Sequence, residues 1–61
     1  MKFIKINAVN GTEVIVFIDK ITHIYSQGFG RCMIKLMSDE GILVDKSAEI
    51  VLRLIQQAYE N

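Results

Sequence analysis

Residues 3–18 read FIKINAVNGTEVIVFI, two apolar segments separated by the pair Asn10-Gly11. Asn-Gly is the strongest short signal for a β-hairpin, because both residues tolerate the positive φ angles of a type I′ turn. The first segment alternates apolar and polar residues over 2–8, as a strand with two different faces does. The second segment, over 13–18, is rich in the β-branched and aromatic residues that strands favour. This stretch therefore predicts that the chain begins with an antiparallel hairpin.

Further short apolar segments follow, each bounded by residues that are typical of turns. We expect three more strands, over residues 22–26, 31–37 and 42–45. Their connections are a turn or single 3₁₀ turn at Asp19-Lys20, a loop over 27–30 and a four-residue loop over 38–41. In the last loop, Gly41 is suited to the left-handed position that closes a hairpin.

After Ser47 the apolar periodicity changes from two to about 3.6 residues, which predicts a helix over 48–59. Ser47 is suited to cap its N-terminus, and Glu49 places a negative charge where the helix dipole favours one. The apolar side of the helical wheel holds Ala48, Val51, Leu52, Ile55, Ala58 and Tyr59, extended by Ile50 and Leu54. This arc covers about half of the circumference, wider than the ~100° stripe of an ordinary surface helix.

Together these elements predict an α+β fold of one domain, residues 1–61. A five-stranded antiparallel β-meander over 2–45, twisted or half-barrelled, is followed by one C-terminal helix over 47–60. So short a chain buries only about 60% of the surface that its unfolded form exposes. Cys32 is the only cysteine, so no internal disulfide is possible, and Cys32 with His23 is too few ligands for zinc. The remaining routes to stability are oligomerisation or a very efficient core.

The apolar residues are more numerous than one helix can cover. Residues of the AVILMFWYC class make up 51% of the chain, and both faces of the predicted strands carry them. A second apolar face must either close on itself or meet another subunit. We therefore expect a homo-oligomer, most simply a dimer. The candidate interface residues are Phe3, Ile15, Phe17, Met33, Met37, Ile50 and Leu54.

The segment 26–32, SQGFGRC, resembles the stacking motif of RNA-recognition domains at three of eight positions. The chain balances seven basic against seven acidic residues, which argues against nucleic acid as a partner. We expect a hairpin tip in which Gly28 and Gly30 take positive φ and present Phe29. Candidate partner-binding residues around this tip are Phe29, Arg31, Tyr25, His23 and Lys35.

No catalytic, calcium-binding or phosphate-binding motif stands out in the chain, so we expect neither an enzyme nor a metal or cofactor site. His23 has no identifiable catalytic partner, and Cys32 is of the residue type most often buried, so both are predicted to be structural. The N-terminus lacks the apolar core of a secretory signal, and no segment reaches the roughly 20 apolar residues of a membrane helix. These features predict a cytoplasmic protein without membrane insertion.

The whole pattern resembles the small FlbD/SwrD-like proteins linked to bacterial flagella and swarming. The similar segments are IKINAVNGTEVIV, the I-x-x-I element Ile21-Thr-His-Ile24 and the helix entry ILVDKSAEIVLRLI. The chain differs in its glycine-rich loop and in its longer tail, AEIVLRLIQQAYEN. The resemblance implies a non-enzymatic accessory role through protein contacts.

Three functions are compatible with these observations. The first is a non-enzymatic, homo-oligomeric binding or regulatory module that acts through protein–protein contacts. The second is a single-stranded nucleic-acid binder that uses the loop around Phe29. The third is a binder of a small ligand, such as a nucleotide, held between subunits near His23 and Arg31.

Overall fold

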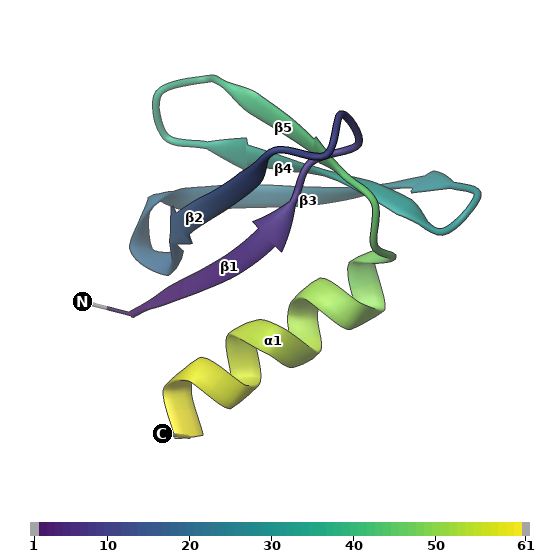
Figure 1. Ribbon diagram of the computed structural model, residues 1–61. Helices are drawn as coiled ribbons and strands as arrows, with labels where there is room; N and C mark the ends of the chain where they lie inside the picture. Colours follow the sequence, from purple (N-terminus) through teal and green to yellow (C-terminus); the bar gives the residue numbers. More distant parts are fainter. Residues whose placement is uncertain (1, 61) are drawn as a thin grey trace.

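A computed structural model describes residues 2–60 of the chain (Figure 1). Its elements in chain order are β1 (Phe3–Asn7), β2 (Glu13–Phe17), the 3₁₀ turn η1 (Ile18–Lys20), β3 (Ile21–Gly28), β4 (Arg31–Leu36), β5 (Gly41–Val44) and α1 (Ala48–Glu60). The five strands and the C-terminal helix are confirmed, as is the 3₁₀ turn. No helix within residues 2–60 is both long enough and apolar enough to cross a membrane.

The strands do not form the single five-stranded meander that the sequence predicts. They form two antiparallel sheets, β1–β2 and β3–β4–β5. The reason is the 3₁₀ turn η1, which redirects the chain between β2 and β3. As a result, these two strands do not pair. Instead, the end of β1 lies against β5 through the bridge Ala8–Val44 and a hydrogen bond that the Val9 amide donates to the Leu43 carbonyl, 3.0 Å.

An irregularity in β3 explains the I-x-x-I spacing. Ile21 pairs with Leu36, but the next pair joins His23 to Lys35, so β3 contributes one residue more than β4. The hydroxyl of Thr22 donates a hydrogen bond to the carbonyl of Lys35 at 3.3 Å. This β-bulge shifts the alternation by one residue. Ile21 and Ile24 can therefore both pack against the core, although they are three residues apart.

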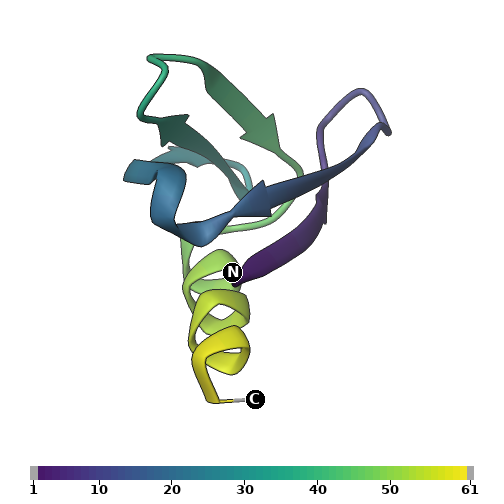
Figure 2. The same ribbon diagram turned by 90° about the vertical axis from the view of Figure 1, so that its left-hand side faces the viewer.

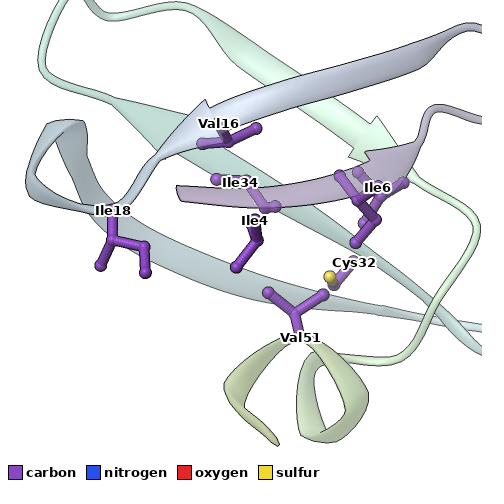
Figure 3. Close-up of a cluster of buried hydrophobic side chains, with 8 residues drawn as sticks. Ile4, Ile6, Val16, Ile18, Cys32, Ile34 and Val51 are labelled. Carbon is purple, nitrogen blue, oxygen red and sulfur yellow. The ribbon is translucent and has the colours of Figure 1, made fainter. Parts of the chain in front are cut away.

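The core lies between the two sheets, and α1 closes one side of it (Figures 1 and 2). Its buried side chains are Ile4, Ile6, Val16, Ile18, Cys32, Ile34, Val44 and Val51. Val51 is the one buried residue of α1 and points from the helix toward Cys32 and Ile4 (Figure 3). The central strand β4 supplies Cys32 and Ile34, which are completely buried.

The helix begins as predicted but is rotated relative to the expected wheel. The Ile50 amide donates a hydrogen bond to Ser47 Oγ at 3.3 Å, which confirms Ser47 as the N-cap. Because the stripe that meets the sheets is centred on Val51, Leu54 packs against the core instead of facing outward as an interface residue. Leu52 and Tyr59, placed by the wheel on the inward side, are exposed.

Two turn predictions are wrong in detail. Gly11 has φ +91° while Asn10 does not have positive φ, so the first hairpin lacks a type I′ turn. Hydrogen bonds from Gly11 N to Ala8 O and from Ala8 N to Thr12 O fit a turn followed by a left-handed glycine. In the last hairpin, Asp39 takes the left-handed position with φ +73°, and Gly41 lies in β5. A Cβ on Gly41 would stand 2.7 Å from Met33 Sδ, so close packing is one role of this glycine.

Candidate interaction surfaces

The tip of the β3–β4 hairpin presents Phe29 as predicted, on a tighter turn. β3 extends through Gln27 and Gly28, so only Phe29 and Gly30 lie outside the strands. Gly28, Phe29 and Gly30 have φ values of +81°, +54° and +72°. The Phe29 side chain is fully exposed, at 102% relative exposure. A left-handed backbone costs a non-glycine residue roughly 1–2 kcal/mol. Phe29 thus combines backbone strain with an exposed aromatic ring, a combination that points to a function.

The outer face of the second sheet collects four of the partner-binding candidates. Tyr25 pairs with Met33 across β3 and β4, and His23 pairs with Lys35. The rings of His23 and Tyr25 are stacked, with centroids 5.6 Å apart and an interplanar angle of 12°. Arg31 shares the outward parity of Met33 and Lys35 along β4 but stands at its far end, four residues or about 13 Å from Lys35. One small ligand would therefore have to span Met33 to reach from His23 to Arg31.

The basic groups on this face have acidic neighbours. Arg31 Nε lies 3.6 Å from Asp45 Oδ1. Lys35 Nζ lies 3.5 Å from Asp39 Oδ1 and donates a hydrogen bond to the Asp39 carbonyl at 3.0 Å. Both ion pairs are partly exposed, so they contribute little to stability. They do lower the local positive potential that an anionic ligand would meet.

Three of the predicted interface residues form one surface, which we call the hairpin patch: Phe3, Ile15 and Phe17. They lie on the outer face of β1 and β2, where Phe3 pairs directly with Phe17. The two phenyl rings meet edge to face, with centroids 6.2 Å apart and an interplanar angle of 79°. These side chains remain 46%, 52% and 43% exposed, respectively.

The other interface candidates are dispersed. Met33 lies on the outer face of the second sheet, and Met37 is exposed just beyond the end of β4. Ile50 is exposed on α1, and Leu54 belongs to the core. The predicted set is divided because the five strands form two sheets and not one continuous surface.

A groove of about 320 Å³ between β3 and α1 was not foreseen from the sequence. Its lining residues are Ile21, Thr22, His23, Ile24, Ala48 and Leu52. Leu52 leaves 54% of its side chain exposed at this groove. The I-x-x-I spacing was the available signal, since it breaks strand alternation and so indicates a bulge at this place.

His23 and Cys32, predicted to be structural, occupy different environments. Nδ1 of His23 lies 3.0 Å from the hydroxyl of Thr22 on the exposed face of β3. Cys32 is completely buried, and this burial raises the pKa of its thiol. Within residues 2–60, no three His, Cys, Asp or Glu side chains are grouped so that they could hold a metal ion.

Comparisons of the chain with protein-family models, with curated proteins and with solved structures found no match.

Proposed function

We propose that this protein is a non-enzymatic, homo-oligomeric binding module that acts through protein–protein contacts. The hairpin patch carries the proposal. Phe3 and Phe17 each leave nearly half of their surface exposed, roughly 70–120 Å² per ring, and Ile15 extends the same patch. Contiguous exposed apolar surface of this kind is suited to binding another protein chain.

The small core supports the same proposal. Within residues 2–60, eight hydrophobic side chains are buried, and α1 covers one side of the two sheets (Figure 2). Domains of this size commonly gain stability from association. The resemblance to FlbD/SwrD-like proteins adds a setting, an accessory role in bacterial motility, in which a module of this kind would act by contact and not by catalysis.

The test is the mass in solution, measured by light scattering over a range of concentrations. We expect a mass above the 6.9 kDa of one chain. Ile15→Lys places a charge in the hairpin patch, beside Phe17 and opposite Lys5, and is expected to reduce association. Gln57→Lys, which adds the same charge at an exposed position of α1, is the matched control and should not. A wild-type mass of 6.9 kDa at every concentration would overturn the proposal.

A second candidate, single-stranded nucleic-acid binding, is favoured by one observation. The stacked rings of His23 and Tyr25 on an open sheet face offer a surface on which bases could stack. The ion pairs of Arg31 and Lys35 weigh against it, as does the formal net charge of zero. Titration with single strands at low salt tests this candidate. It predicts affinity that falls steeply with salt and is lost in Tyr25→Ala and Phe29→Ala, and no binding at low salt would dismiss it.

A further inference from the structure

One edge of β3 is open. β3 is the longest strand, with eight residues, and within residues 2–60 it pairs with β4 alone. Its sequence, ITHIYSQG, contains no Lys, Arg, Asp, Glu or Pro. Proteins that avoid edge-to-edge pairing usually place charges or proline on such a strand. The absence of these residues from β3 makes it suited to pair with another strand.

Two complementary features lie at opposite ends of this strand. The groove borders its first half, from Ile21 to Ile24, and continues to the exposed side chain of Leu52. Phe29 follows directly after its last residue and is fully exposed. In an antiparallel pair of identical strands, the end of each strand lies beside the beginning of the other.

We propose that two copies of this chain associate through their β3 edges, antiparallel about a two-fold axis beside Tyr25 and Ser26. This places Phe29 of each copy in the β3–α1 groove of its partner. The interface is isologous, since the same residues contribute from both copies. The proposal rests on the proposed function in requiring self-association, and it adds the β3 edge to the hairpin patch as a second contact surface.

The dimensions fit. An apolar cavity of about 150 Å³ holds a benzene molecule, and the groove offers about 320 Å³. Burying one phenyl ring removes roughly 150–250 Å² from water. Two seated rings and a similar area of groove wall together come to about 600–1,000 Å². The added strand pairing then brings the contact to the ~1,200 Å² at which specific interfaces begin.

Charge also favours a second copy as the occupant. The residues that line the groove include no Lys, Arg, Asp or Glu, and neither does β3. Pairing two copies through these residues therefore buries no formal charge, while an anionic partner would find no counter-charge there. The formal net charge of the chain is zero, so the copies do not repel each other at long range. In the dimer the exposed ring of Phe29 becomes buried, which accounts for a strained backbone that holds it away from its own chain.

Sedimentation equilibrium on the full chain tests the proposal with two variants on opposite sides of the contact. Phe29→Asn removes the ring and keeps the turn, because asparagine tolerates left-handed φ and Asn-Gly suits this hairpin. Leu52→Glu charges the groove wall at an exposed helical site. Each should raise the dimer dissociation constant at least tenfold. Gln57→Glu, with the same added charge on another part of α1, should leave it unchanged.

The outcomes separate this proposal from the proposed function. A wild-type oligomer that persists unchanged in both Phe29→Asn and Leu52→Glu overturns the β3 interface but leaves a homo-oligomer. If Ile15→Lys alone dissociates it, the hairpin patch is the interface instead. A wild-type monomer overturns both. Circular dichroism of each variant checks that its secondary structure is retained, so that a lower solution mass reports dissociation and not unfolding.

Discussion

Replacing Phe29 with asparagine should change the stability of the single chain and of the dimer in opposite directions. Phe29 is fully exposed in the single chain, so its removal sacrifices no contact there. Its φ of +54° lies in the left-handed region, which costs roughly 1–2 kcal/mol for most residues and less for asparagine. We expect Phe29→Asn to stabilise the single chain by about 1 kcal/mol. For a domain of this size that raises the melting temperature by roughly 4–8 °C.

The measurement is urea unfolding followed by circular dichroism at several protein concentrations. At concentrations far below the dissociation constant, Phe29→Asn should unfold at higher urea than the wild type. Binding of a partner stabilises the native state by about 2.7 kcal/mol when its concentration is 100 times the dissociation constant. The wild type should gain this stabilisation as its concentration rises, and the variant should not. The order of the two unfolding midpoints should therefore reverse.

Phe29→Ala is the control that separates backbone strain from the ring. Alanine lacks the ring but retains the cost of positive φ, so the single chain should remain close to wild-type stability. If asparagine and alanine give the same stability at low concentration, the argument from backbone strain is refuted. If Phe29→Asn and Phe29→Ala both destabilise the single chain, then the Phe29 ring packs against its own chain and is not available to contact a partner.

Three further predictions concern the fold itself. Ile34→Ala should cost about 2–5 kcal/mol because Ile34 is completely buried; this is a large part of a total of roughly 3–9 kcal/mol for 61 residues, so urea unfolding should show a midpoint far below that of the wild type. Ser47→Ala should cost about 1 kcal/mol in urea unfolding by removing the N-cap hydrogen bond to Ile50, and an unchanged midpoint would contradict that role. Burial raises the pKa of the Cys32 thiol, so the neutral thiol favours the folded state fully below the ordinary thiol pKa of about 8.5, and this stabilisation is lost as pH rises through the raised pKa. Cys32→Ala lacks the thiol, so its free energy of unfolding should fall less between neutral and alkaline pH than that of the wild type. Equal falls in the two proteins would contradict this cause.

The sequence was sufficient for the local structure. Asn10-Gly11 marked the first turn, alternation marked the strands, and Ser47 marked the start of α1. The presentation of Phe29 was also predictable, because two glycines around an aromatic residue favour a tight hairpin. The turn geometry was less accessible, since Asn10-Gly11 and the 38–41 loop each admit more than one turn type, and neighbouring strands select among them.

The candidate surfaces were predictable only as types of residue. Phe3, Ile15 and Phe17 were expected at an interface, and they lie together because β1 pairs with β2 in that register. Leu54 was misplaced because the wheel gives the width of an apolar arc but not which part of it meets the sheets. The β3–α1 groove was missed because its walls come from segments about 25 residues apart in the chain.

Periodicity, turn residues and caps act within a few positions along the chain, so the sequence by itself determined the order, type and approximate limits of the elements. Only the tertiary structure decided three features. They are the division into two sheets, the orientation of α1 with Val51 toward the core, and the open edge of β3 beside its groove. The reason is physical: each depends on which distant segments exclude water from one another, and many arrangements of the same local elements can satisfy the same hydrophobic pattern.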